Sequence, residues 1–247
     1  MLKSFTLAID GGPLPGGLAR SAATPAPGPA APGKPVHVRR APESPSAERI
    51  ARAMDVMVAL AALLFFMPLM LVIALMVRLS GGPVFFGQAR VGRDGMLFTC
   101  RKFRTMHVDS DDLLRRVLEQ DPEARAEWER DHKLRNDPRV IPMGRLLRKL
   151  SLDELPQLFN VLEGTMGIVG PRPIVQAEAH RYGRYFQIYC RVRPGITGLW
   201  QISGRNATTY RRRIACDVAY VRGKSVARDA QIMLKTIPAV CLARGAY

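Results

Sequence analysis

Two adjacent carboxylates, Asp153 and Glu154, stand a few residues after Arg148 in the sequence. Such a pair beside a cation stays ionised, and an ionised carboxylate can act as a nucleophile or as a Mg²⁺ ligand. The same residues also fit the start of a helix, because Ser151 and Glu154 match a capping box. If Asp153 is the cap instead, Pro156 falls within the first turn, where its missing N–H costs little. Catalysis and helix capping therefore both stay open for Asp153 and Glu154.

Two further groups of cations are candidates for phosphate binding. Arg172 lies between Pro171 and Pro173, which hold the backbone extended and lower the entropic cost of aiming a guanidinium at a phosphate. Lys102 and Arg104 are two residues apart on an expected strand, so alternation places them on one face as an anion site. The alternatives are a tight turn with a solvated Arg172, and contact of Lys102 and Arg104 with acidic lipid headgroups.

A glycine-rich stretch, residues 193–206, combines a permissive backbone with hydroxyl groups, arginines and Trp200. A loop of this composition could hold a nucleotide or a sugar. Its candidate binding residues are Arg193, Thr197, Gln201, Arg205 and Asn206. The alternatives are a plain connecting loop, or a loop whose Trp200 lies at a membrane interface.

An apolar segment precedes all of these groups. Residues 56–77 are 22 consecutive uncharged residues, which as a helix would run about 33 Å, enough to cross the hydrocarbon of a bilayer. Arginines flank both ends, and basic flanks favour the cytoplasmic side. A helix broken at Pro68 would return both flanks to one face, although broken backbone exposed to lipid is costly. Charge alone therefore leaves a re-entrant and a spanning helix open.

Charge and composition divide the chain into unlike parts. The 247 residues carry 37 Lys and Arg against 21 Asp and Glu, a net charge of +16. Residues 1–46 are rich in Pro, Ala and Gly, and we expect this tail to be disordered because it cannot bury enough apolar surface. We expect a membrane helix over residues 47–80 and a catalytic domain over residues 81–247. The four cysteines and four histidines of the chain are too scattered for a structural zinc site.

The sequence after the apolar segment predicts a mainly helical domain with a small β-hairpin. Asp94 and Gly95, between the apolar runs 84–86 and 96–100, predict the hairpin turn. Pro122 divides a helical stretch over residues 110–132 into two pieces. Further helices are expected over residues 143–150, 153–163, 174–188, 207–220 and 226–242, the last of them kinked or stopped near Pro238.

Four motifs give the chain a resemblance to a known family. They are residues 102–106 (KFRTM), 150–157 (LSLDELPQ), 169–173 (VGPRP) and 193–201 (RPGITGLWQ). In this order, and after an apolar helix, they resemble the bacterial sugar transferases, which are monotopic phosphoglycosyl transferases acting on polyprenyl phosphate. The resemblance covers residues 47–247 and extends to the short type that initiates exopolysaccharide synthesis.

The resemblance implies a reaction and roles for its residues. A sugar 1-phosphate would pass from a UDP-sugar to undecaprenyl phosphate, with release of UMP. Asp153 would be the nucleophile that forms a covalent phosphosugar intermediate, and Glu154 would assist, with both carboxylates as ligands of Mg²⁺. Arg148 and Arg172 would hold phosphates. UDP-galactose is the favoured donor and UDP-glucose the next, and no residue decides between them.

The resemblance also implies a location. It predicts a re-entrant helix broken at Pro68, in the inner membrane of a bacterium, with the catalytic domain facing the cytoplasm. Family members often have Ser before that proline, whereas this chain has Met67. The expected partners are the UDP-sugar, undecaprenyl phosphate, membrane lipids and later polysaccharide-assembly enzymes, and not nucleic acid. The alternative from another class is a membrane-tethered protein that binds acidic lipids or nucleic acid, which the charge of +16 alone would fit.

Overall fold

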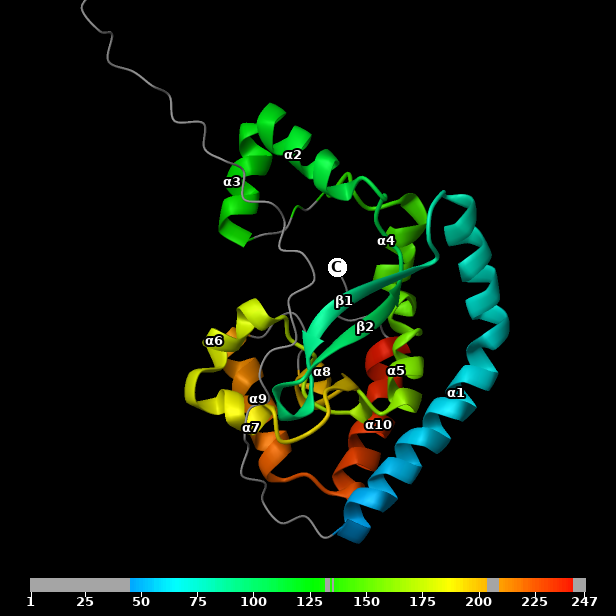
Figure 1. Ribbon diagram of the computed structural model, residues 1–247, viewed down its shortest axis with the longest axis vertical. Coiled ribbons are helices and arrows are strands. Elements are labelled where there is room, and N and C mark those ends of the chain that lie inside the picture. The colour runs from blue at the N-terminus through cyan, green and yellow to red at the C-terminus, as the bar shows by residue number, and fades with distance from the viewer. Residues whose placement is uncertain (1–44, 132–133, 135, 204–208, 242–247) are drawn as a thin grey trace, which may run out of the picture. The chain divides into compact units, whose positions relative to one another are not determined.

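The computed structural model describes residues 45–131, 134, 136–203 and 209–241 (Figure 1). Of the predicted tail, residues 1–44 lie outside the described residues, and residues 45 and 46 already belong to the first helix. Within the described residues the fold is mostly helical with two small two-stranded sheets, one of them the predicted hairpin. The expected mainly helical fold with a small β-hairpin is therefore confirmed.

Helix α1 (Pro45–Leu79) is the longest element, and Figure 1 shows it as one continuous ribbon. The helix continues through Pro68 without interruption, although Figure 1 shows that its axis bends along its length. A proline removes one backbone hydrogen bond, but Leu63 and Met70 are buried in the main hydrophobic core on either side of it. Packing on both sides of Pro68 therefore holds α1 as a single helix.

The two faces of α1 have different surroundings although both are apolar. The inner face packs with α5, β3 and α10. The outer face exposes large apolar side chains, among them Leu64 at 79% and Phe65 at 77%. By length and composition α1 could cross a membrane, and only 22% of its most apolar stretch is buried. This low burial sets it apart from the core helix of a water-soluble domain.

The hairpin carries part of the candidate site. Strand β1 (Phe85–Val91) pairs with the antiparallel strand β2 (Leu97–Phe103), and the turn between them is the 3₁₀ segment η1 (Arg93–Gly95). Asp94 and Gly95 both have positive φ, 56° and 75°, as a tight Asp-Gly turn requires. The predicted hairpin is confirmed, with longer strands than the apolar runs alone indicate.

The next helices also follow the sequence closely. Helix α2 (Ser110–Gln120) is followed by α3 (Pro122–Asp131), with Pro122 as its first residue, where a proline is well tolerated. Helix α4 (Pro142–Lys149) corresponds to the expected helix over residues 143–150. Helices α9 (Tyr210–Arg222) and α10 (Val226–Cys241) are also confirmed, and α10 continues through Pro238.

Two parts of the fold differ from expectation. Residues 174–188 do not form one helix. They form the short segments η3 (Gln176–Glu178), α6 (Ala179–Tyr182), η4 (Gly183–Tyr185) and α7 (Phe186–Tyr189). Gly183 has a φ of 48°, which interrupts a right-handed helix.

The second difference is a parallel ladder that the sequence did not indicate. Strand β3 (Gly167–Val169) pairs with β4 (Gly195–Thr197), which leads into α8 (Leu199–Ile202). A Cβ on Gly195 would lie 2.1 Å from the Gly170 nitrogen, so only glycine allows this approach. The ladder brings the 169–173 and 193–201 motifs together.

Candidate active site

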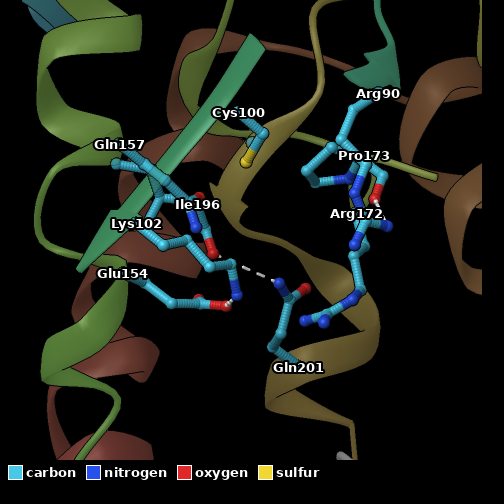
Figure 2. Close-up of a pocket in the computed structure, with 10 residues that line it drawn as sticks. Arg90, Cys100, Lys102, Glu154, Gln157, Arg172, Pro173, Ile196 and Gln201 are labelled. Carbon is cyan, nitrogen blue, oxygen red and sulfur yellow. Dashed lines mark hydrogen bonds and ion pairs between the residues drawn. The ribbon is translucent and has the colours of Figure 1, made fainter. Parts of the chain in front are cut away.

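Lys102 lies between the two carboxylates of the acid pair. From strand β2 its Nζ approaches Glu154 Oε1 at 2.6 Å and Asp153 Oδ2 at 3.7 Å. Figure 2 shows Lys102 and Glu154 on one side of a cavity, facing Arg90, Arg172 and Gln201 on the other. Glu154 and two of the predicted phosphate-binding cations, Lys102 and Arg172, are therefore brought to one cavity.

The acid pair belongs to a 3₁₀ turn and does not cap a helix. Asp153 and Glu154 lie in η2 (Leu152–Glu154), which follows Ser151 in the left-handed region at φ 57°. The side chain of Ser151 makes no cap hydrogen bond, and α5 (Gln157–Glu163) starts after Pro156. Both capping interpretations are therefore wrong, because the chain makes a separate turn before α5. That turn leaves the carboxylates free to contact Lys102.

The two carboxylates have opposite electrostatic settings. Asp153 is 7% exposed, and its burial raises its pKa, although Lys102 and Arg148 partly oppose this and Glu154 adds to it. Burial also acts to raise the pKa of Glu154, but Lys102, Arg172 and Arg90 outweigh it and leave that pKa below its usual range. Glu154 lines the cavity, whereas Asp153 does not line it and approaches it only through its contact with Lys102. Glu154 is therefore the firmly ionised member and Asp153 the more basic one.

The opposite wall presents two guanidiniums. Arg172 stacks over the ring of Trp200 at 5.7 Å. Arg90 donates to Pro173 O at 3.1 Å and to Gln88 Oε1 at 2.6 Å, which are both neutral acceptors. Burial and the neighbouring Arg172 lower the pKa of Arg90. Among the described residues no carboxylate forms an ion pair with Arg90 or Arg172, so this wall can neutralise an incoming anion.

Arg148 also reaches the site. From α4 it donates through Nε to Thr105 Oγ1 at 2.9 Å. The positive charge of Arg148 acts to lower the pKa of Asp153. The predicted proximity of Arg148 to the acid pair is therefore present.

Arg104 does not face the cavity with Lys102, contrary to expectation. Its side chain is 5% exposed and donates to the backbone carbonyls of Val77, Pro83 and Met106 at 2.7–3.0 Å, and to that of Gly81. Strand β2 ends at Phe103, so the alternation that would pair Lys102 with Arg104 has already stopped. Arg104 binds the carbonyls at the end of α1 and the segment that follows.

The residues of the expected nucleotide or sugar loop separate. Gln201 lines the cavity. Arg193 donates to Gly164 O at 2.8 Å and lines a different cavity, and buried Thr197 hydrogen-bonds Thr236 Oγ1 at 2.8 Å. Arg205 and Asn206 lie outside the described residues. Of the described candidate binding residues of this loop, the structure thus brings only Gln201 to the cavity that Glu154 lines.

Arg90 was missed as a site residue, because the sequence places it only among the basic flanks of the apolar segment. The register of the hairpin is the feature that could have predicted Arg90 as a site residue. Phe86 pairs with Lys102, Gln88 with Cys100 and Arg90 with Phe98, and directly opposed residues share one face of a sheet. Once the Asp-Gly turn fixes the register, Arg90 is expected on the Lys102 face.

The donor set at the acid pair suits one mode of magnesium binding. Among the described residues no group of three or more His, Cys, Asp or Glu could hold a metal ion. Mg²⁺ is commonly held by one or two carboxylates together with phosphates of the substrate and water. Asp153 and Glu154 provide such a pair next to a wall suited to phosphate, so they fit a magnesium ion that binds together with a phosphate-bearing substrate.

Comparisons with known proteins identify a family and several relatives of this chain. A family model described as bacterial sugar transferase matches residues 46–243. The exopolysaccharide production protein ExoY of Rhizobium meliloti (strain 1021) is 51% identical over 197 residues, which cover 79% of this chain and 87% of that protein.

Two further relatives have names that describe a reaction. The undecaprenyl-phosphate galactose phosphotransferase of Salmonella typhimurium is 47% identical over 202 residues, or 82% of this chain and 42% of that protein. The UDP-glucose:undecaprenyl-phosphate glucose-1-phosphate transferase of Caulobacter vibrioides is 39% identical over 207 residues, or 79% of this chain and 71% of that protein. This chain therefore resembles less than half of the Salmonella protein.

Proposed function

Because the chain belongs to the bacterial sugar transferase family, we propose that it transfers a sugar 1-phosphate from a UDP-sugar to undecaprenyl phosphate, releasing UMP. Relatives named for this reaction with galactose and with glucose support the proposal. The product would be the first lipid-linked sugar of an exopolysaccharide or capsule repeat. It would then be a substrate for later polysaccharide-assembly enzymes.

The observation that carries the proposal is the cavity in which Lys102 and Glu154 face Arg90 and Arg172, with the carboxylate of Asp153 3.7 Å from the ammonium of Lys102. Phosphoryl transfer needs positive charge around the transferring group and a nucleophile held in line with the leaving group. Arg90 and Arg172 supply the positive charge. Their partners among the described residues are neutral groups or an aromatic ring, so their charge is available to the phosphates. The acid pair supplies the nucleophile.

In the first step a carboxylate oxygen of Asp153 attacks the sugar-linked phosphorus of the UDP-sugar. A carboxylate–phosphorus bond forms, and the bond from that phosphorus to the bridging oxygen breaks, so that UMP leaves with the electron pair. Arg90 and Arg172 hold the diphosphate and stabilise the charge on UMP. Lys102 and Arg148 keep Asp153 ionised against its burial, since both cations lower its pKa.

In the second step a phosphate oxygen of undecaprenyl phosphate attacks the same phosphorus. The new diphosphate bond forms, the bond to Asp153 breaks, and the carboxylate is regenerated. No proton needs to be gained or lost. Glu154, whose pKa lies below its usual range, stays ionised in both steps.

Asp153 and Glu154 would be the ligands of Mg²⁺ in this scheme. When bound, the ion would neutralise negative charge on the diphosphate. Lys102 now lies between the two carboxylates, and it would move toward the phosphates when the metal and the substrate bind. For the donor, we propose UDP-galactose, with UDP-glucose next, because relatives carry both names.

We also propose that α1 enters and leaves the bacterial inner membrane on the cytoplasmic side. Arg52, near the start of α1, donates to Val161 O at 2.7 Å and to Leu162 O at 3.1 Å. At the other end of α1, Arg104 donates to Val77 O at 3.0 Å. The ends of a spanning helix would lie on opposite surfaces of the bilayer, about 30 Å apart. A domain bound to both ends would then have to lie partly within the hydrocarbon of the bilayer. Attachment of both ends to one domain supports a helix that meets lipid with its outer face.

Labelling would test this topology. In a cysteine-free background, Ile50→Cys and Leu79→Cys place exposed thiols at the two ends of α1. With a membrane-impermeant maleimide, both should be protected in intact spheroplasts and both labelled in inverted vesicles. Labelling of the two sites from opposite sides would contradict the proposal.

The reaction itself is tested by a screen for UMP release from UDP-sugars. Purified full-length chain in lipid nanodiscs receives undecaprenyl phosphate and Mg²⁺, and both UMP and the lipid-linked sugar are measured. UDP-galactose should give the fastest release. No UMP from any UDP-sugar, combined with nucleic-acid binding that falls steeply with salt, would favour a tethered nucleic-acid-binding protein instead.

A further inference from the structure

A second cavity, which we call the basal cavity, lies at the start of α1. It is lined by the first turns of α1, by β3 and by the segment that leads into β4. Of the residues predicted from sequence to bind substrate, only Arg193 lines it. The transfer chemistry proposed above does not use this cavity.

Positive charge exceeds negative charge in the basal cavity. Its cations are Arg52, Arg93, Arg191, Arg193 and Lys224, and its carboxylates are Glu48, Asp55 and Asp229. Burial lowers the pKa of Arg193, and the nearby guanidiniums of Arg93 and Arg52 lower it further. The cations therefore repel one another in a partly buried place, and a bound anion would relieve that repulsion.

Each carboxylate of the cavity already has another partner. Asp55 Oδ1 accepts from the Ile168 backbone N–H at 2.9 Å, and Asp229 Oδ1 accepts from Tyr220 Oη at 2.8 Å. Glu48 pairs with Arg93. These acids hold the cavity walls together, and five cations face only three carboxylates in the cavity.

Arg191 is the cation with the clearest lack of a partner. Its Nε is buried without a hydrogen-bond acceptor, and no side-chain hydrogen bond or ion pair joins it to any residue that the structure describes. The guanidinium of Arg93, by contrast, forms ion pairs with Glu48 and Asp94. A buried charged donor without an acceptor is costly, so Arg191 indicates a ligand with oxygen acceptors.

The position of the basal cavity narrows the ligand class. Asp55 lines the cavity and is followed directly by the apolar run of residues 56–77. If a membrane contacts the outer face of α1, the start of this apolar run lies at the depth of the lipid headgroups. The basal cavity then lies near those headgroups. We propose that the basal cavity binds a phosphate group, carried by an anionic phospholipid headgroup or by a free phosphate compound. Clustered guanidiniums suit phosphate because each can offer two parallel N–H donors.

The test uses Arg191→Gln in the full-length chain. The matched control is Arg211→Gln, which removes an exposed arginine of α9 outside the basal cavity. Each protein is placed in nanodiscs of phosphatidylglycerol and phosphatidylcholine and released for native mass spectrometry. A second arm titrates inorganic phosphate into delipidated protein in neutral detergent and follows the thermal unfolding midpoint, which a ligand of the folded state raises.

Wild type and Arg211→Gln should retain a phosphatidylglycerol molecule that Arg191→Gln loses by about tenfold or more, as expected for loss of a charge-assisted hydrogen bond. If no lipid is retained but phosphate raises the midpoint of wild type and Arg211→Gln and not of Arg191→Gln, the cavity is supported with free phosphate as the source. Equal lipid retention and equal phosphate response in all three proteins, or no binding in any, would overturn the proposal. Because neither arm measures sugar transfer, failure here is distinct from failure of the proposed reaction.

Discussion

In the active-site cavity the Glu154 carboxylate lies 2.6 Å from the ammonium of Lys102, whereas in the basal cavity the Asp55 carboxylate accepts a backbone N–H of Ile168 at 2.9 Å. Both cavities have walls rich in arginine. In the first, the acids contact the ammonium of a lysine, whose flexible stem would let a substrate displace it. In the second, Asp55 is held by the backbone of the ladder strand β3.

This difference distinguishes a cavity suited to group transfer from a cavity whose carboxylate Asp55 has a structural role. A cation-rich cavity alone can bind an anion, but group transfer also needs a carboxylate whose partner can move away. The contrast predicts that acids of the active-site cavity control rate and that Asp55 controls stability. Substitutions in the two cavities test this contrast.

The largest effect is expected for Asp153→Asn. The amide cannot form the covalent intermediate, so the rate of UMP release should fall by about 10³-fold or more. The free energy of unfolding should change little, because the variant removes the charge of a buried carboxyl group whose pKa is already raised by burial. Steady-state kinetics and a thermal melt measure both. Near-normal turnover would remove Asp153 from the mechanism.

A smaller effect is expected when the guanidinium wall is changed. Arg172→Lys keeps the charge but loses the planar fork that can bind phosphate in two places. We expect kcat/KM for the UDP-sugar to fall by about 10- to 100-fold, matching loss of one charge-assisted hydrogen bond. Arg211→Lys on the exposed face of α9 is the control. Equal kinetics for the two variants would place the phosphate elsewhere.

Lys102→Met should shift the pH dependence of the reaction. Lys102 lowers the pKa of Asp153, so its removal raises that pKa further. Protonated Asp153 cannot attack, and the acidic limb of the kcat/KM profile should therefore move to higher pH. The position of the limb is read separately from the drop in maximal rate. A limb that stays in place would mean that another group controls it.

The smallest effect on turnover is expected for Asp55→Ala. It leaves the buried N–H of Ile168 without its acceptor, which should lower the free energy of unfolding by about 1–3 kcal/mol. The kcat of the folded fraction should stay near that of wild type. Asp55→Asn, which keeps an acceptor oxygen, should recover most of the stability. A selective loss of kcat in both variants would erase the contrast between the cavities.

Much of the fold was predictable from local pattern. The apolar segment, the Asp-Gly turn and Pro122 each fixed an element, because each acts through nearby residues. The ladder of β3 and β4 was not predictable, since its strands are short and its pairing depends on contacts distant in sequence. The same limit applies to the helix expected over residues 174–188, which Gly183 interrupts.

The site was predictable where a motif acts locally and was missed where it depends on tertiary contacts. Asp153, Glu154, Arg148, Lys102 and Arg172 came together as expected. Arg104 did not, because the position where β2 ends decides its direction. Arg90 was missed because its role needs the hairpin register. Pro68 stays helical because core packing on both sides holds it.

The central claim is that Asp153 becomes covalently bound to the phosphosugar. Mass spectrometry of the full-length chain, mixed with UDP-sugar and Mg²⁺ in nanodiscs without acceptor lipid, tests it directly. We predict a hexose-phosphate adduct that maps to Asp153, is absent in Asp153→Asn and disappears when undecaprenyl phosphate is added. An adduct on Glu154, or turnover with no adduct under any quench condition, would contradict the account.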